Sequence, residues 1–193
     1  MDLRKFLFSY RSYTPIPLLV AMLLLAKPTV LSLSVGFVIA TLGESLRIWA
    51  VRHAGGATRT TRDVGAGAEL ITHGPYAYVR NPLYLGNFIL SFGLCLMSWA
   101  WMPWMALVFL ALFGIQYAGI ILLEEEHLLQ RFGQTYREYL ASVPRFLPSL
   151  APFKQQAVQA MLLSRALKIE KSTLMSFAAV TVAILVIWRL QLS

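Results

Sequence analysis

Three consecutive carboxylates follow directly on an apolar run of the chain. Glu124, Glu125 and Glu126 come immediately after the apolar residues 105–123. If that run is a helix, the carboxylates lie at its C-terminal end, where the helix dipole is already negative. Burial close to a membrane would make the negative charge costlier still. A cation must offset it, and Arg80 or a cationic ligand is the expected partner.

A second group of polar side chains stands at the start of another apolar run. Arg80 and Asn81 precede the apolar residues 83–99, and Tyr84, Asn87 and Ser91 lie inside that run. The spacing i, i+3, i+7 puts the last three on one face of a helix. Polar groups are costly where water is excluded, so this face indicates a site that binds something.

These features also have plainer explanations. Carboxylates just outside a membrane span are usually solvated, and an arginine near the end of a span usually reaches the lipid phosphates. Glu44 and Arg47, three residues apart near the end of the apolar residues 29–51, fit an ordinary helical ion pair. Glu44 is the more suggestive of the two, because it lies about two turns inside the run.

The composition is that of an integral membrane protein. Of the 193 residues, 58% are hydrophobic and 13% are charged, whereas a soluble domain carries about 25% charged residues. The net charge of +8 is typical of loops that face anionic lipid, and no nucleic-acid-binding motif accompanies it. The single cysteine, Cys95, lies in an apolar run and is expected to be a packing residue.

The hydropathy pattern predicts an all-α fold with about five transmembrane helices. A span needs about 20 mainly apolar residues, and the N-terminal apolar segment is interpreted as a retained anchor rather than a signal peptide. A polar helix is expected over residues 124–141, and a basic segment lying in the membrane interface over 153–171. The five predicted spans are residues 12–26, 29–51, 83–99, 105–123 and 172–190.

The distribution of Lys and Arg predicts the orientation. Basic residues gather in the N-terminal segment, between the second and third spans, and between the fourth and fifth, whereas the other two connections are nearly uncharged. The positive-inside rule therefore places the N-terminus and both polar regions in the cytoplasm, at the inner membrane if the source is bacterial. The residues concerned include Arg4, Lys5, Arg11, Arg47, Arg52, Arg59, Arg62, Arg80, Arg131, Arg137 and Arg145.

No soluble catalytic domain or internal repeat accompanies these spans. The glycines of "VGAGAEL" do not form the G-x-G-x-x-G fingerprint of dinucleotide binding. Any cofactor must therefore be held by loops and helix ends at the cytoplasmic membrane surface. No metal site is expected.

Two motifs resemble those of the isoprenylcysteine carboxyl methyltransferase and phospholipid methyltransferase superfamily. The string "HGPYAYVRNPLYLGN" is followed some forty residues later by "EEEHLLQRFGQTYREYLASVPRFLP". The family pattern has a Gly-Pro-Tyr turn, Arg-His-Pro-x-Tyr-x-Gly, a hydrophobic hairpin, a Glu pair, Phe-Gly-x-x-Tyr and a Val-Pro-Arg-like end. The corresponding positions are Gly74, Pro75, Tyr76, Arg80, Asn81, Pro82, Tyr84, Gly86, Glu124, Glu125, Phe132, Gly133, Tyr136, Val143, Pro144 and Arg145.

The resemblance implies a membrane enzyme that uses S-adenosylmethionine, with Glu124, Arg80 and Asn81 as candidate catalytic residues. Arg80 would pair with the cofactor's carboxylate, and the Glu pair would accept hydrogen bonds from its ammonium or ribose groups. The cofactor-binding residues that the resemblance implies are His73, Gly74, Tyr76, Val79, Arg80, Asn81, Tyr84, Leu85, Gly86, Glu124 and Glu125. Periodicity suggests an acceptor tunnel lined by Glu44, Arg47, Ser91 and Gln116, with Arg145 as a further candidate.

The chain departs from the family pattern at two positions. Asn81 stands where the family usually has His, and Asn does not titrate near neutral pH. Ile120 stands one turn before the Glu pair, where the eukaryotic isoprenylcysteine branch has Arg; Arg47 or Arg145 could substitute. The acceptor is expected to be an isoprenylcysteine-type carboxylate, with a phospholipid amine, a small thiol or a catalytically degenerate scaffold as alternatives.

The expected organisation is a methyltransferase core over residues 1–149, with the motifs at 72–148, followed by residues 150–193. This last part would hold the interfacial segment and an extra C-terminal transmembrane helix. That helix is expected to pack against the bundle, with a homodimer contact or closure of a lateral opening as alternatives. The expected partners are the membrane and a lipophilic small molecule or lipid, and no nucleic acid.

Overall fold

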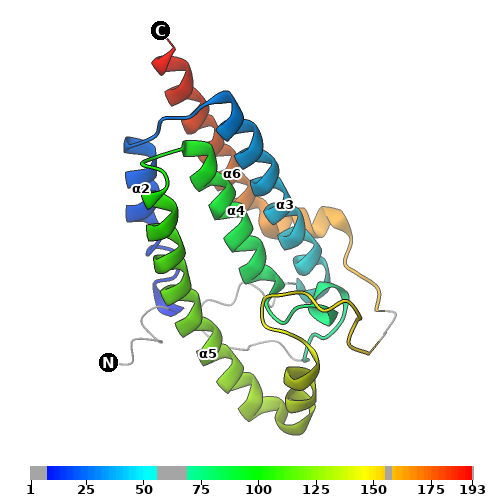
Figure 1. Ribbon diagram of the computed structural model, residues 1–193. Helices are drawn as coiled ribbons and strands as arrows, with labels where there is room; N and C mark the ends of the chain where they lie inside the picture. Colours follow the sequence, from blue (N-terminus) through cyan, green and yellow to red (C-terminus); the bar gives the residue numbers. More distant parts are fainter. Residues whose placement is uncertain (1–7, 56–68, 155–157, 193) are drawn as a thin grey trace.

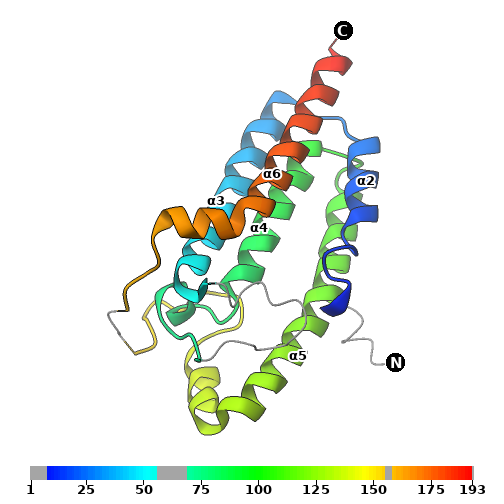
Figure 2. The same cartoon turned by 180° about the vertical axis from the view of Figure 1, so that it is seen from behind.

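The computed structural model describes residues 8–55, 69–154 and 158–192, and this part of the chain is all-helical. The expected all-α fold is confirmed. The helix α3 packs most extensively on α4 and also contacts α6, while α2 and α5 lie on the other side of α4 (Figures 1 and 2). The elements are α2 (Ile16–Leu24), α3 (Val30–Ala54), the 3₁₀ helix η2 (Gly74–Ala77), α4 (Pro82–Ser98), α5 (Trp104–Ser142) and α6 (Leu163–Gln191).

Helices α3 and α4 approach so closely that only small side chains fit between them. A Cβ atom added at Gly43 would lie 2.3 Å from the backbone nitrogen of Leu90, and one at Gly93 would lie 2.3 Å from that of Ala40. Gly86 lies against Gly43 in the same seam. Small residues at such contacts let helix backbones pack directly in membranes. The seam fixes how the start of α4 is presented to α3.

Three described helices, α3, α5 and α6, are long and apolar enough to cross a membrane. The expectation of about five spans is therefore corrected. Helix α4 is apolar but has 17 residues, or about 25 Å of length. Helix α2 has nine residues, because Pro15 precedes it and Lys27-Pro28 follows it. Exposed apolar side chains cover α3, α5 and α6, among them Leu31, Val38, Leu42, Ile115, Val182 and Val186.

Two predicted boundaries are wrong. The predicted span 105–123 and the predicted polar helix 124–141 are both helical but form one element, α5, which continues to Ser142 and leaves helical geometry at Gly133, with φ 52° and ψ −121°. Helix α6 begins at Leu163, so the second half of the predicted interfacial segment is continuous with the last span. The change from apolar to charged residues suggested that a helix ends at each boundary. The backbone of each helix instead continues through it. Arg4, Lys5, Arg59 and Arg62 lie outside the described residues.

The polar connections gather at one end of the bundle. The segments 69–81, 143–154 and 158–162 lie there, and the C-terminal end of α6 lies at the opposite end (Figure 1). The turn between α4 and α5, also at the opposite end, exposes Trp99, Trp101 and Trp104. Tryptophans at such positions are typical of the membrane–water interface. The two motif regions therefore share one end of the molecule, as the sequence predicted.

Candidate functional site

The two motif segments are joined through their backbones. The amide of Arg80 donates to the carbonyl of Pro144, that of Ser149 to Tyr78, and that of Phe153 to Ala77, each at 2.9 Å. Beneath them the hydroxyl of Tyr139 donates to the carbonyl of Tyr76 at 2.7 Å. Positions some sixty residues apart along the chain thus form one unit at the polar end of the bundle.

A small apolar cluster supports this unit. Tyr136, Tyr139 and Val143 are buried, and Phe132 and Phe153 pack against them. The kink at Gly133 turns the last part of α5 back toward η2, which lets these rings reach the turn (Figure 1). Burial of aromatic surface of this size stabilises such a contact by several kcal/mol, about 1.5–3 for each ring.

Glu125 is held by two guanidinium groups. Its Oε1 lies 3.1 Å from Arg80 Nη2, and its Oε2 lies 2.6 Å from Arg145 Nη2. Arg145 Nε also donates to Oε1 at 3.1 Å, and the carboxylate of Glu125 raises the pKa of the Arg145 guanidinium. Arg80 Nη1 donates to the carbonyl of Leu140 at 2.9 Å. Two cations therefore offset the charge at this point of α5.

Glu124 has a different environment from Glu125. The hydroxyl of Tyr84 donates to Glu124 Oε1 at 2.5 Å, and the ring of Tyr84 meets the ring of Tyr117 edge-on at 5.0 Å. This contact links the start of α4 to the end of the apolar part of α5. The two adjacent carboxylates thus take different partners, a phenol for one and guanidinium groups for the other.

The polar turn places the remaining motif residues around the same entrance. Asn81 precedes α4, and its Nδ2 donates to the carbonyl of Arg145 at 3.3 Å. The ring of His73 contacts the ring of His53 at 5.3 Å. Gly74 has φ 62°, and a Cβ there would lie 2.4 Å from the His53 ring, so glycine is required at this turn. Val79 is buried.

A buried charged cluster lies deeper in the bundle. Arg47 Nη2 donates to Glu170 Oε2 at 2.6 Å and to Thr173 Oγ1 at 3.3 Å. Its Nη1 donates to Asn87, and its Nε lies 3.5 Å from Glu44 Oε2. Side chains of α3, α4 and α6 thus meet on one guanidinium, which we call the Arg47 cluster (Glu44, Arg47, Asn87, Glu170 and Thr173).

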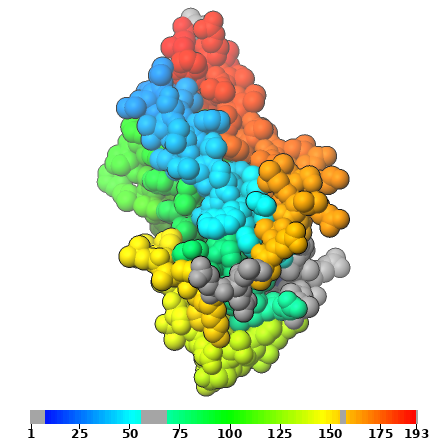
Figure 3. All heavy atoms as spheres, turned by 90° about the vertical axis from the view of Figure 1, so that its right-hand side faces the viewer, coloured from blue at the N-terminus to red at the C-terminus, as the bar shows by residue number. Residues whose placement is uncertain are grey.

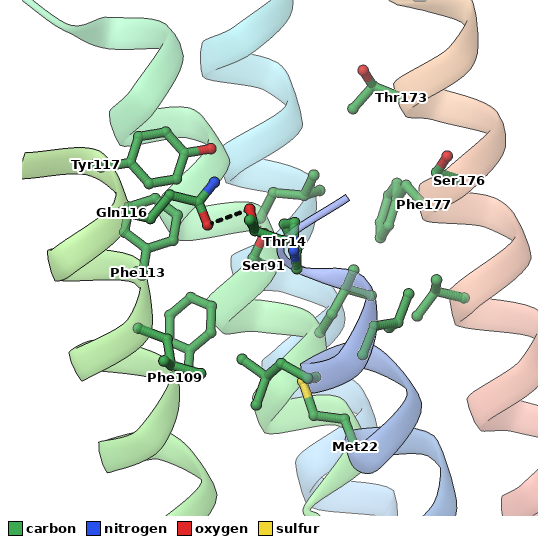
Figure 4. A pocket seen from close by; sticks show the side chains of 17 residues that line it. Thr14, Met22, Ser91, Phe109, Phe113, Gln116, Tyr117, Thr173, Ser176 and Phe177 are labelled. Atoms are coloured by element: carbon green, nitrogen blue, oxygen red, sulfur yellow. Dashed lines mark hydrogen bonds between the residues drawn. The ribbon is translucent and has the colours of Figure 1, made fainter. Parts of the chain in front are cut away.

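An apolar cavity of about 230 Å³ lies between α2, α4, α5 and α6. Figure 4 shows Phe109, Phe113 and Tyr117 projecting from α5 on one side and Phe177 from α6 on the other. Gln116 and Ser91 line it, as the periodicity suggested, and Thr14 donates to Gln116 Oε1 at 2.8 Å. Arg145, Glu44 and Arg47 are not among its lining residues.

The cavity and the polar entrance share side chains. Tyr117 lines the cavity, accepts a hydrogen bond from Asn87 Nδ2 at 3.0 Å and packs against Tyr84. Thr173 lines the cavity as well and belongs to the Arg47 cluster. One continuous arrangement therefore runs from the apolar cavity to the motif residues.

Sequence reasoning missed Glu170, Thr173 and Tyr117 as members of this arrangement. A signal was present in α6: Ala166, Glu170, Thr173 and Phe177 follow helical spacing, and Glu170 is the one acid among residues 158–192. An acid between Lys168 and Lys171 reads most simply as a surface ion pair. Only the packing of α6 on α3 shows that Glu170 is buried, with 2% of its surface exposed.

Comparison with known proteins identifies the family. A family model of phospholipid methyltransferases matches residues 31–135, more than half of the chain. The chain belongs to this family. The match takes in α3, η2, α4 and most of α5, and it ends before α6 begins.

Curated relatives are about 30% identical to the chain over the part that aligns. The nickel-cobalt-cadmium resistance protein NccN of Alcaligenes xylosoxydans xylosoxydans is 30% identical over 65% of this chain and 54% of its own length. Protein-S-isoprenylcysteine O-methyltransferase of Tribolium castaneum is 30% identical over 63% and 43%. The cobalt-zinc-cadmium resistance protein CzcN of Cupriavidus metallidurans is 30% identical over 68% and 55%. The chain thus matches about half the length of these relatives.

Proposed function

We propose that the chain is an integral membrane methyltransferase. It takes the methyl group from S-adenosylmethionine and transfers it to a lipophilic acceptor. An isoprenylcysteine-type carboxylate is the first candidate acceptor, because a relative of the chain is named for that reaction. A phospholipid amine, suggested by the family description, and a small thiol are the alternatives.

One observation carries this proposal. Polar side chains from both motifs, namely Arg80, Tyr84 and Glu124, converge at an entrance that adjoins an apolar cavity through Tyr117. A reaction between a polar cofactor and an apolar acceptor needs such a junction, since each reactant must reach the other without leaving its own surroundings. The arrangement supports methyl transfer at the boundary between the two regions.

The residues present at the entrance fit the proposed cofactor. Arg80 Nε is buried and has no hydrogen-bond partner among the described residues, so it offers a donor to a carboxylate. Glu124 offers an acceptor to an ammonium or hydroxyl group. Bound S-adenosylmethionine would supply a methyl group attached to a sulfonium, which is electrophilic. The protein's part is to orient this group and to exclude water.

The cavity fits the apolar part of an acceptor. Its lining is mainly Leu, Phe and Met side chains, with hydroxyl and amide groups at a few points. Small-molecule pockets usually measure about 300–1,000 Å³, so about 230 Å³ suits a short chain or the reactive end of a longer lipid. Exposed apolar side chains of α5 and α6 on either side would face the lipid.

Two relatives are named for metal resistance, but we do not extend metal binding to this chain. Within residues 8–55, 69–154 and 158–192, no three His, Cys, Asp or Glu side chains gather in a way that could hold a metal ion.

The alternative from another class of function is a membrane scaffold that has lost activity. It is favoured by Asn81, which stands where the family usually has His.

The polar end is proposed to face the cytoplasm, at the inner membrane if the source is bacterial. The support is the charge of the segments gathered there, which include Arg52, Arg80, Arg145 and Lys154. The division into a core of residues 1–149 and a C-terminal part of residues 150–193, and a homodimer through α6, both stay predictions.

Calorimetric titration with S-adenosylhomocysteine tests the proposal. The parent protein in mild detergent should bind it at one site, and Tyr84→Phe and Glu124→Gln should each weaken binding about tenfold, which is the usual cost of one charge-assisted hydrogen bond. Glu138→Gln is the matched control, because Glu138 pairs with Lys154 at the surface, where both side chains are more than half exposed. If the folded parent protein binds no S-adenosylhomocysteine, the proposal is refuted.

The acceptor is found by transfer of radiolabelled methyl into a total lipid extract, followed by chromatography. Label in an alkali-labile ester identifies a carboxylate acceptor, and stable label in phospholipid identifies an amine. Binding without any transfer to lipids or to a panel of thiols would favour the scaffold.

A further inference from the structure

The Arg47 cluster holds two carboxylates, those of Glu44 and Glu170, against one guanidinium. Glu44 and Glu170 have side chains that are 5% and 2% exposed, and Arg47 is 11% exposed. All three lie in helices long and apolar enough to cross a membrane. Glu170 makes the hydrogen bond to the guanidinium, at 2.6 Å, whereas neither oxygen of Glu44 has a hydrogen-bond partner among the described residues. Two buried carboxylates on one guanidinium carry a desolvation cost that their attraction to the cation does not reliably repay, so stability alone does not explain the cluster.

The carboxylate that is hydrogen-bonded to Arg47 comes from outside the part of the chain that the family model matches. The match ends at residue 135, and Glu170 lies in α6, 123 positions from Arg47. Figure 3 shows the first part of α6 against the end of α3, where the amide of Met161 donates to the carbonyl of Arg52 at 2.7 Å. Helix α6 is thus seated on α3 at the level of the cluster.

The cluster is connected to the junction between the cavity and the entrance. Arg47 fixes Asn87 through its oxygen, which leaves the amide nitrogen of Asn87 to donate to Tyr117. Tyr117 stacks on Phe113 at 3.9 Å within the cavity wall. Glu170 therefore sets the position of Arg47, Arg47 orients the amide of Asn87, and that amide holds Tyr117 where the cavity meets Tyr84.

We propose that Glu170 is a positioning residue for methyl transfer, and that α6 completes the acceptor side of the site. The proposal rests on the proposed function. Glu170 acts through Arg47, Asn87 and Tyr117 on the wall that holds the acceptor's reactive end. It does not contact the Tyr84–Glu124 pair that is assigned to the cofactor, so it should affect turnover more than cofactor binding.

Glu170→Gln tests this because the variant should fold. The change leaves Arg47 with Glu44, a neutral pair, rather than an isolated buried cation. Three quantities are measured on the full chain in detergent: the thermal midpoint, the Kd for S-adenosylhomocysteine, and methyl transfer into total lipid extract at saturating S-adenosylmethionine. Glu138→Gln, the same exchange at an exposed pair, is the control.

The expected result is a split between binding and turnover. Glu170→Gln should lower transfer at least about tenfold while changing the Kd for S-adenosylhomocysteine by less than about threefold. Glu170→Asp, which keeps the charge on a shorter side chain, should restore part of the transfer. A fluorine label on Tyr117 should shift its NMR signal in Glu170→Gln and not in Glu138→Gln, because the hydrogen bond from Asn87 loses its anchor.

Three results would overturn the proposal. They are transfer within about twofold of the parent, a loss of transfer that only parallels a loss of cofactor binding or of folded protein, and an unchanged fluorine signal. If the parent protein and Glu170→Gln both bind S-adenosylhomocysteine and both transfer methyl, the positioning role alone is refuted. A parent protein that does neither refutes the proposed function, and the positioning role with it.

Discussion

The two neighbouring carboxylates, Glu124 and Glu125, have different hydrogen-bond partners. Both oxygens of Glu125 are bonded to guanidinium groups, which ties the end of the apolar part of α5 to Arg80 and Arg145. Among the described residues, Glu124 has a hydrogen-bond donor on one oxygen, the Tyr84 hydroxyl. Glu125 is therefore suited to hold the two motifs together, and Glu124 retains the capacity to accept from a ligand.

Replacement of Asn81 tests whether the chain has an active site or a degenerate one. Its side chain donates to the carbonyl of Arg145, and an imidazole N–H could make the same bond. We expect Asn81→His to keep the Kd for S-adenosylhomocysteine within about threefold of the parent and to add no titration near pH 6.5 to the transfer rate. Calorimetry and a pH–rate profile measure both.

An opposite result at this position would change the interpretation. If the parent binds no cofactor and Asn81→His does, the chain is a degenerate relative that lost its site at this position. Ser142→Ala, which removes a hydroxyl bonded only to its own helix at the surface, is the control for handling the variants.

At the scale of helices, the α3–α4 seam places Arg47 beside the start of α4. Gly43 and Gly86 meet there, and a Cβ on Gly86 would lie 2.6 Å from Arg47 Cγ. Any separation of the two helices would therefore pull Arg47 away from Asn87. The seam and the site depend on the same backbone contact.

Substitution in the seam should be costly even for the smallest side chain. A Cβ on Gly93 would lie 2.3 Å from the nitrogen of Ala40 and 2.7 Å from the carbonyl of Gly36, both backbone atoms. We expect Gly93→Ala to destabilise the protein by about 1–3 kcal/mol, as overpacking does. Gly114 is the matched control, because a Cβ there meets nothing within 4 Å, and alanine should stabilise the helix by about 0.5–1 kcal/mol.

Thermal midpoints in detergent measure both variants of the seam test. A midpoint for Gly93→Ala at or above that of Gly114→Ala would show that the helices do not touch as described.

The ends of the helices were predictable where hydropathy or a nearby proline determines them. They were not predictable where contacts with distant parts of the chain determine them. Pro82 and the apolar run after it predicted the start of α4 to within one residue. The sequence predicted helix on both sides of Glu124 and named Arg80 as a partner. It missed that α5 runs through Glu124 as one helix as far as the kink at Gly133, because the second guanidinium, that of Arg145, comes from elsewhere in the chain. Likewise the motifs named Arg80, Tyr84 and Glu124, but Glu170 and Tyr117 required the packing of α6 and α5.

At the scale of the whole molecule, one end is polar and basic and the other is bordered by tryptophans. The chain's single cysteine, Cys95, is fully buried. A cysteine introduced at an exposed position can therefore report which side of the membrane it occupies.

Labelling from outside should distinguish the two ends. We expect Leu192→Cys, at the exposed end of α6, to react with a membrane-impermeant maleimide in intact cells. Arg165→Cys, exposed near the polar end, should react only after permeabilisation. Labelling of both positions from the same side would contradict the orientation, and the unsubstituted protein gives the background from Cys95.

The distance along the chain between Arg47 and Glu170 also has a consequence for biosynthesis. The guanidinium enters the membrane with α3, before α6 has been synthesised, and the carboxylate of α6 follows 123 positions later. Until α6 inserts, Arg47 has Glu44 as its anionic partner in the cluster, and the wall of the cavity that α6 supplies is missing. A nascent chain can therefore assemble its α3–α4 seam before α6 is made, but the cavity acquires its α6 wall only when that helix inserts.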